Sequence, residues 1–314
     1  MVWKKVNIKD FKKVLLVHNT SSGPRAFSLA TKQHVRIIEA DLKLAYGEER
    51  FQKIRLKTYE EMLEAGQKIC DEKYDWVIVA GGDGSLRALV ETFIKRDYYP
   101  YVSVFPAGTV NLVAKELSQQ TDSAAWFANV QEGNVLPVWL GKGNDRIFLT
   151  VTGVGVDSLV VDNVKASEKK YLSSLAYLKQ GGIVAGQELL LRRWKYKFKV
   201  MIDNDGKWRS ATSVIVTKSK YYAGRFSLAK GGSISKPVLY VCIFTGGKVV
   251  DFLRYTALIA ADLLRLDKTV KIIEAQQVQI KCNVKNFAAE LDGDSVATSP
   301  LDISILPTPI NFIS

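Results

Sequence analysis

Ala80-Gly81-Gly82-Asp83-Gly84-Ser85 joins two apolar segments of different periodicity. The residues before it, Trp76 to Val79, form a short continuous apolar run, which is typical of a buried strand. The apolar residues after it, between Leu86 and Ile94, recur at the spacing of one helix face. This stretch therefore predicts a buried strand, a glycine turn and a helix that begins near Ser85.

The three glycines of this turn leave its backbone bare. A phosphate can approach such N–H groups, and the helix that follows adds the positive end of its dipole. A carboxylate such as Asp83 repels a phosphate unless a divalent cation or a transferred proton lies between them. The turn thus suggests a nucleotide together with a metal, but Gly and Asp are also ordinary turn residues, so a structural role stays open.

A second glycine loop, Phe105-Pro106-Ala107-Gly108-Thr109-Val110-Asn111, follows the short apolar segment from Tyr101 to Phe105. A helix is expected after it, from Leu112 to Leu117. Two successive strand, loop and helix units place both loops at the same carboxyl edge of a parallel sheet, where such folds bind ligands. One cleft could therefore use both loops.

Strands and helices alternate over residues 1–132. Lys13 to His18 and Phe51 to Leu56 are predicted strands, and Thr58 with Glu61 predicts a capped helix from Tyr59 to Cys70. A helix is also expected up to about Leu44, and another from Thr121 to Val130. The alternation predicts a three-layer α/β nucleotide-binding domain with a parallel sheet.

Strands dominate over residues 133–314. Val135 to Leu140 and Arg146 to Thr152 are predicted to form a hairpin around residues 141–145, and helical segments are expected within Val164 to Leu191 and near Val249 to Arg265. Further strands are predicted at Ser213 to Thr217, Val238 to Thr245, Val270 to Glu274, Val278 to Cys282 and Leu301 to Leu306. The pattern indicates a second domain, an antiparallel β-sandwich, whose last residues could return to the first domain.

Composition describes an ordinary globular protein with an unusual charge. Of its 314 residues, 47% are hydrophobic and 24% are charged, which excludes a disordered chain, and the net charge of +12 suits anionic membranes, nucleic acid or acidic substrates. Three widely spaced cysteines argue against a disulfide framework or a zinc site and favour a reducing cytoplasm. We find no secretory signal or apolar span, so membrane contact is expected to be peripheral.

Arg192 to Lys199 alternates basic residues with aromatic ones. This pattern is typical of a sandwich strand with a solvated basic face, and membrane docking is the second interpretation. Nucleic acid comes last because no nucleic-acid motif accompanies the patch. His18 and His34, at a strand end and in a helix, are interpreted as structural residues.

Five segments appear in an order that resembles the diacylglycerol kinase catalytic family, which includes soluble bacterial lipid kinases and is related to sphingosine kinases. They are Asn19-Thr20-Ser21-Ser22-Gly23, Gly81-Gly82-Asp83-Gly84-Ser85, Pro106-Ala107-Gly108-Thr109-Val110-Asn111, Gly153-Val154-Gly155-Val156-Asp157 and Asp292-Gly293-Asp294. NAD kinases and phosphofructokinases share the Gly-Asp-Gly turn, so the ordered set carries the resemblance, and it spans most of the chain.

The resemblance implies that ATP binds between the two domains, that Asp83 holds Mg²⁺ and that Asp294 is the catalytic base, with Asp292 and Asp83 as alternatives. The family more often has glutamate at the position of Asp294 and aspartate at that of Leu112, and Ser235 to Tyr240 lacks the aspartates of a structural magnesium site. The implied nucleotide contacts are Asn19, Ser21, Ser22, Gly23, Thr58, Gly81, Gly82, Asp83, Gly84, Ser85, Leu86, Arg87, Gly108, Thr109 and Asn111.

The sequence therefore predicts an ATP- and Mg²⁺-dependent lipid kinase that phosphorylates a hydroxyl of a membrane lipid, such as diacylglycerol or a sphingoid base. Its expected partners are that lipid and an anionic membrane surface, with no nucleic acid, and a homodimer is left open. The alternatives are a kinase of a soluble acceptor such as NAD, and a nucleotide- or lipid-binding regulatory protein without catalysis.

Overall fold

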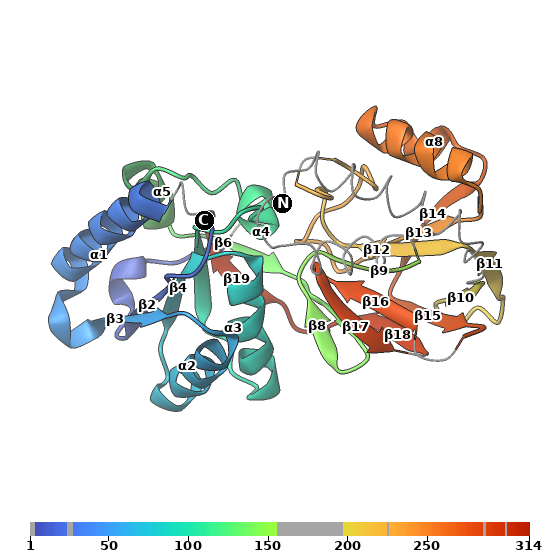
Figure 1. Ribbon diagram of the computed structural model, residues 1–314. Helices are drawn as coiled ribbons and strands as arrows, with labels where there is room; N and C mark the ends of the chain where they lie inside the picture. The colour runs from blue at the N-terminus through green and yellow to red at the C-terminus, as the bar shows by residue number, and fades with distance from the viewer. Residues whose placement is uncertain (1–3, 24–27, 156–196, 225, 285–286, 299) are drawn as a thin grey trace. The chain divides into compact units, whose positions relative to one another are not determined.

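The computed structural model describes residues 4–23, 28–155, 197–224, 226–284, 287–298 and 300–314 (Figure 1). The chain divides into two compact units. The first contains Met1–Val138 and Thr308–Ser314, and the second contains Trp139–Pro307. The predicted helical segment within Val164 to Leu191 lies outside the described residues.

The first unit is built on a seven-stranded sheet of order β1-β6-β19-β5-β4-β2-β3. Strands β2 to β5 are parallel to their neighbours, β19 runs parallel to β5, and β6 is antiparallel to β19. The strands are β1 (Lys4–Lys5), β2 (Val14–Asn19), β3 (Phe51–Leu56), β4 (Trp76–Gly81), β5 (Tyr101–Pro106), β6 (Asn134–Val138) and β19 (Ile310–Ile313). Every residue of β4 is buried, as its continuous apolar run predicts.

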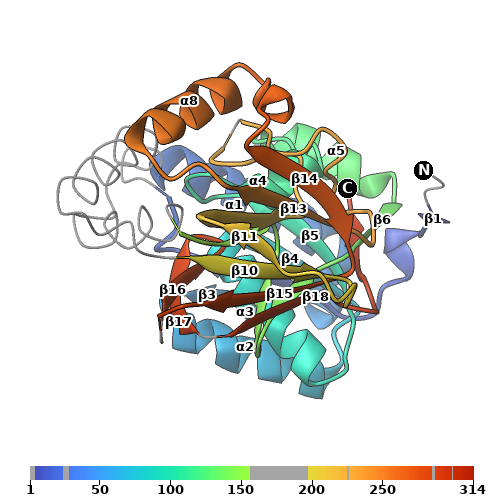
Figure 2. The ribbon, with the colours of Figure 1, turned by 90° about the vertical axis from the view of Figure 1, so that its right-hand side faces the viewer.

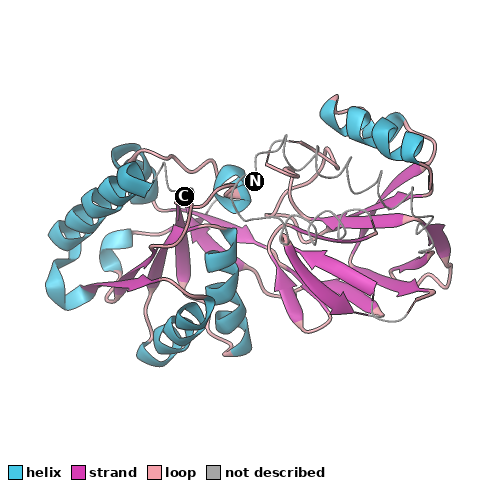
Figure 3. Ribbon diagram, in the orientation of Figure 1, coloured by secondary structure: helices cyan, strands magenta, loops and turns pink. Residues whose placement is uncertain are grey.

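Helices cover both faces of this sheet (Figure 3). On one face α1 (Ser28–Arg50) and α5 (Ser123–Gln131) enclose a core that includes Ile38, Trp76 and Trp126. On the other face lie α2 (Tyr59–Glu72) and α3 (Asp83–Lys95), which approach closely because Gly66 leaves room for the side chain of Thr92. A short 3₁₀ helix, η1 (Ile8–Asp10), and α4 (Leu112–Glu116) complete the unit. The predicted three-layer α/β fold is confirmed.

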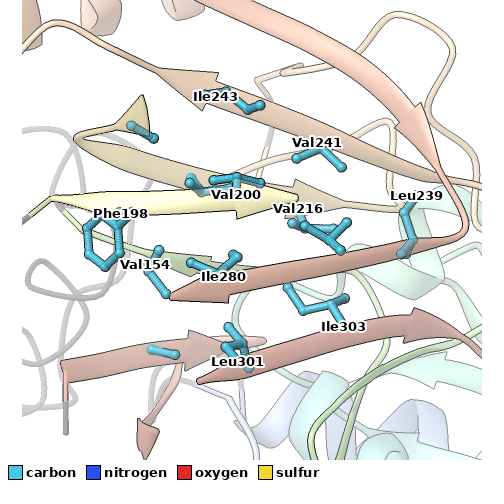
Figure 4. Close-up of a cluster of buried hydrophobic side chains, with 14 of the residues drawn as sticks. Val154, Phe198, Val200, Val216, Leu239, Val241, Ile243, Ile280, Leu301 and Ile303 are labelled. Atoms are coloured by element: carbon cyan, nitrogen blue, oxygen red, sulfur yellow. The ribbon is translucent and has the colours of Figure 1, made fainter. Parts of the chain in front are cut away.

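The second unit is an antiparallel sandwich of two six-stranded sheets, of order β11-β10-β15-β18-β7-β8 and β14-β13-β12-β9-β16-β17. Apolar side chains from both sheets fill the space between them, among them Phe198, Val216 and Ile280 (Figure 4). The strands are β7 (Gly141–Gly143), β8 (Arg146–Phe148), β9 (Val151–Val154), β10 (Phe198–Ile202), β11 (Arg209–Ala211), β12 (Ser213–Thr217), β13 (Leu239–Phe244), β14 (Val270–Ala275), β15 (Gln277–Cys282), β16 (Phe287–Leu291), β17 (Asp294–Thr298) and β18 (Leu301–Ile305). The predicted sandwich is confirmed.

One helix, α8 (Val249–Ala260), packs on the outer face of the sheet that contains β13 and β14 (Figure 2). A 3₁₀ turn, η3 (Leu264–Leu266), follows it. Within the residues that the structure describes, no helix is both long and apolar enough to cross a membrane.

The predicted hairpin of Val135 to Leu140 with Arg146 to Thr152 is wrong. Strand β6 joins the first sheet and pairs with β19, placing Leu136 opposite Phe312. The actual hairpin is shorter and consists of β7 and β8, with Gly141 opposite Phe148. The apolar alternation of β6 suits either sheet equally, so the local sequence cannot identify a partner strand that lies at the other end of the chain.

Candidate phosphate-binding site

Three parallel strands, β2, β4 and β5, end at the same edge of the first sheet, and their loops carry most of the candidate residues. The side chain of Asn19 connects two of these loops. Its Nδ2 atom donates a hydrogen bond to Ser85 Oγ at 2.7 Å, and its Oδ1 atom accepts one from the Ser21 N–H at 2.9 Å. Asn19 thereby fixes the loop after β2 against the first turn of α3.

The glycine loops after β4 and β5 pack backbone against backbone. A Cβ atom on Gly108 would lie 2.5 Å from Gly82 Cα, and one on Gly81 would lie 2.9 Å from Ser85 Cβ. Gly23 has φ +82°, and a Cβ there would lie 2.7 Å from the carbonyl oxygen of Ala107. Gly23, Gly81 and Gly108 are therefore required for packing of the loops themselves.

Gly84 has no such explanation. It is the second residue of α3, and a Cβ atom at this position would have no heavy atom within 4 Å. Its backbone is also not in the left-handed region. Neither packing nor conformation requires a glycine here, and the space beside its backbone is open to a ligand.

Asp83, the first residue of α3, caps α4. Its Oδ2 atom accepts a hydrogen bond from the Leu112 N–H at 2.8 Å, and its Oδ1 atom accepts one from the Val113 N–H at 3.1 Å. Asn111, at φ 52°, exchanges two hydrogen bonds with the backbone of Gly108, each of 2.9 Å. Asp83 thus joins the two glycine loops, a role that the sequence analysis did not foresee, because it becomes visible only when both loops are placed in space.

The Asp83 carboxylate also fits a magnesium ion. A carboxylate offers about four lone-pair positions, so it can accept hydrogen bonds and bind a cation at the same time. Within the described ranges no group of three or more His, Cys, Asp or Glu residues is placed to hold a metal. Mg²⁺ is often bound through one or two carboxylates, with the remaining ligands from phosphate and water oxygens. Asp83 is suited to that kind of site.

Thr58 caps α2, as the sequence predicts. Its hydroxyl accepts a hydrogen bond from the Glu61 N–H at 3.2 Å, while Glu61 Oε2 accepts one from the Lys57 N–H at 2.6 Å. Leu86 and Arg87 are almost fully buried in α3. The Leu86 N–H donates a hydrogen bond to the carbonyl oxygen of Gly82 at 3.1 Å.

A cavity of about 380 Å³ lies within the first unit, beside the loop after β5. Five candidate residues line it, namely Ser22, Gly23, Gly108, Thr109 and Asn111. The cavity also brings in residues that the sequence analysis did not select, including His34 and Thr121. His34 Nδ1 lies 3.1 Å from Ser123 Oγ, so the ring is held in place by α5.

His18, at the end of β2, is buried beside this edge. Burial, and then the charges of Lys53, Arg55 and Lys32, lower its pKa from 6.5 to about 4. The imidazole is therefore neutral at physiological pH, which is consistent with the structural role expected from the sequence.

The acidic hairpin of the second unit separates the roles of two candidate carboxylates. Asp292, at φ 47°, and Gly293, at φ 80°, form the turn between β16 and β17, as their sequence suggests. The Asp292 carboxylate accepts four hydrogen bonds from residues 149–151: from the N–H groups of Leu149 (2.6 Å), Thr150 (2.8 Å) and Val151 (3.2 Å), and from the Thr150 hydroxyl (2.8 Å). Asp292 is thus committed to holding this segment.

Asp294 is the first residue of β17 and pairs with Leu291 across the turn. The neighbouring Glu290 is almost fully buried, and its Oε2 atom accepts a hydrogen bond from the Gly293 N–H at 2.7 Å. Asp294 thus lies directly beside the turn, and of the two aspartates Asp292 is the one that holds residues 149–151.

Comparison with known proteins gives two family matches. The model of the diacylglycerol kinase catalytic domain matches residues 13–142, and that of the YegS C-terminal NAD kinase beta sandwich-like domain matches residues 150–314. A "Putative lipid kinase" of Streptococcus pneumoniae is 24% identical over 311 residues, which cover 96% of this chain and 98% of that protein. A "Diacylglycerol kinase" of Bacillus subtilis is 25% identical over 235 residues, covering 73% and 74%.

Among solved structures, a "putative diacylglycerol kinase" from Bacillus anthracis has the same fold. The TM-score is 0.76 at 21% identity, and the match covers 97% of each chain.

Proposed function

The chain belongs to the diacylglycerol kinase catalytic family, and from this premise we propose that it transfers the γ-phosphate of ATP to a hydroxyl of a membrane lipid. Membership of this family identifies the chain as a lipid kinase at the level of the family. The acceptor, the nucleotide and the metal are parts of the proposal. The observation that carries it is the pair of glycine loops held together at the carboxyl edge of the parallel sheet, with an unobstructed backbone at Gly84.

The nucleotide phosphates are proposed to lie over residues 81–87. Phosphoryl transfer is catalysed chiefly by positioning and by charge neutralisation, and a helix N-terminus with a bare backbone supplies both without moving. Asn19 and Asp83 hold the two flanking loops in place, so the N–H groups of this turn are already oriented. The other proposed contacts come from Ser21, Ser22, Gly23, Thr58, Thr109 and Asn111.

In this proposal Asp83 holds Mg²⁺, which when bound neutralises charge on the phosphate oxygens. Asp294 accepts the proton of the acceptor hydroxyl while the hydroxyl oxygen forms a bond to the γ-phosphorus. The bond between that phosphorus and the bridging oxygen of ATP breaks. Asp292 is a positioning residue, because its carboxylate is engaged by residues 149–151.

A soluble acceptor such as NAD is the second candidate. It is favoured by one observation, the match of residues 150–314 to a family model described as NAD kinase beta sandwich-like. That match concerns the sandwich alone, whereas lipid kinase names recur among relatives that align with most of the chain.

The test incubates the purified chain with γ-labelled ATP, Mg²⁺ and a panel of acceptors: diacylglycerol and sphingoid bases in mixed micelles, and NAD in buffer. The proposal expects label in one lipid in the organic phase, and loss of that label when Mg²⁺ is chelated. Label in NAD alone would favour the soluble acceptor. ATP binding without transfer to any acceptor would favour a non-catalytic binder.

A further inference from the structure

Helix α8 is anchored by one face. Tyr255 and Ile259 are buried against the outer face of the β13 and β14 sheet, and the rings of Tyr255 and Phe244 are 5.0 Å apart in an edge arrangement. The Tyr255 hydroxyl accepts a hydrogen bond from the Gly246 N–H at 2.9 Å. These contacts hold the helix rigidly, so its opposite face is a fixed surface.

That opposite face is exposed and apolar. Val250 and Leu253 are 60% and 56% exposed, and Ala257 and Ala260 continue the same helical face. Beyond the helix, Leu263 and Leu266 are exposed as well. We call these six residues the α8 surface. Exposed apolar side chains gathered in this way mark an interaction site, unlike scattered ones.

The charges around the α8 surface are mostly positive. Lys248 precedes the helix, and Arg265 and Lys268 follow it, all of them exposed. The nearby carboxylates are already paired with cations: Asp251 and Asp267 with Arg254, and Asp262 with Lys230. The surface therefore combines exposed apolar side chains with a basic rim.

We infer that the α8 surface docks the protein onto an anionic lipid bilayer, with α8 lying in the plane of the interface. This inference rests on the proposed function, because a lipid kinase must reach an acceptor held in a membrane. An amphipathic helix with basic flanks binds an interface by burying its apolar face, while each lysine or arginine gains from the anionic headgroups.

A second copy of the chain fits this surface less well. A two-fold dimer brings the same patch of both copies together. The basic rims of the two copies, which contain Lys248, Arg265 and Lys268, would then lie against each other, and like charges repel. An anionic bilayer has the complementary charge.

Two lysines on the other sheet, Lys199 of β10 and Lys281 of β15, offer a different docking face. Lys199 is exposed on the outer face of the other sheet, and the ammonium of Lys281 lies 4.6 Å from the ring centroid of Trp208. Because the hydrophobic core lies between the two sheets, this face and the α8 surface point in opposite directions. One flat membrane cannot contact both, so experiment can separate them.

The test is sedimentation of the full chain with vesicles of phosphatidylglycerol and phosphatidylcholine, without ATP. The α8 variants are Val250→Ser/Leu253→Ser and Arg265→Glu/Lys268→Glu. Their matched controls are Leu29→Ser/Leu44→Ser, which change side chains of α1 that are 81% and 89% exposed, and Lys199→Glu/Lys281→Glu. Each α8 variant is expected to lose about tenfold or more in vesicle affinity, and each control is expected to change by less than about twofold.

The inference is overturned if both α8 variants bind vesicles like the unaltered chain, or if the controls lose binding instead. It is also overturned if light scattering shows a dimer that the α8 variants dissociate while vesicle binding is unchanged. Turnover of a short-chain diacylglycerol in non-ionic detergent separates this inference from the proposed function. Wild-type levels in the α8 variants are expected there, whereas no lipid phosphorylation by the unaltered chain would overturn the proposed function alone.

Discussion

Replacing Asp292 with Asn separates structural from catalytic carboxylates in the acidic hairpin. Asn tolerates the positive φ of this position, so the change acts on hydrogen bonding alone. If the amide oxygen takes the Oδ1 position, it keeps the bonds from Thr150 and Val151, but the amide nitrogen then meets the Leu149 N–H, which loses its acceptor. The three remaining bonds also lose the strength that the negative charge gives them.

One lost charge-assisted bond, one unsatisfied N–H and three weakened bonds together cost about 3 kcal/mol of unfolding free energy. For a unit of this size, that lowers the melting temperature by roughly 6–12 °C. Asp294→Asn is the matched control, two residues further along the hairpin. It is expected to melt within about 3 °C of the unaltered chain and to lose about 100-fold or more in turnover, because an amide cannot accept the hydroxyl proton.

The assay combines thermal unfolding, followed by circular dichroism, with transfer of label from ATP to lipid. The reasoning is refuted if Asp292→Asn melts like the unaltered chain but loses turnover, while Asp294→Asn keeps it. Asp292 would then be the base, and its four hydrogen bonds would contribute little to stability.

Three further changes test the first unit. Gly108→Ala places a Cβ 2.5 Å from Gly82 Cα, so it should lower the melting temperature and also weaken ATP binding measured by calorimetry. An unchanged melting temperature and unchanged ATP affinity would contradict the close packing of the two loops. Thr58→Ala removes the α2 cap and should lower the free energy of unfolding in urea by about 1 kcal/mol, whereas Thr58→Asp should restore it. If Thr58→Asp restores ATP binding as well, the Thr58 hydroxyl acts only as a helix cap. His18 has a folded-state pKa of about 4, below its ordinary 6.5, so as pH drops from 6.5 to 4 the unfolded chain binds the proton first and the free energy of unfolding falls by up to about 3 kcal/mol. In urea unfolding measured across this pH range, His18→Asn should remove that fall. An unchanged pH dependence in the variant would rule out His18 as its cause.

Local signals in the sequence predicted most of the fold. The run Trp76 to Val79 and the cap at Thr58 each combine residues that are close in sequence, and each has the predicted structure. The partner of β6 could not be predicted in this way, because β6 pairs with β19, at the far end of the chain. Pairing over such a separation depends on the packing of the whole unit.

The candidate site was predictable in its residues but not in its contacts. Spacing placed Gly82 and Gly108 at one sheet edge, where they meet backbone to backbone. The sequence does not reveal the hydrogen bonds of Asp83 to the start of α4. The side chain of Leu112 is apolar, and it is the Leu112 backbone N–H that donates to Asp83. Backbone partners carry no signature in the residue type.

Label transfer from ATP to lipid by Gly84→Ala, compared with the unaltered chain at equal folded concentration, tests whether the glycine loops bind the phosphates of a lipid kinase. The added methyl meets no protein atom within 4 Å and favours the helix, so the melting temperature should stay equal or rise. We expect label in lipid from the unaltered chain and at least about tenfold less from Gly84→Ala, because the methyl occupies the path of a phosphate. Equal transfer by both proteins would contradict this expectation.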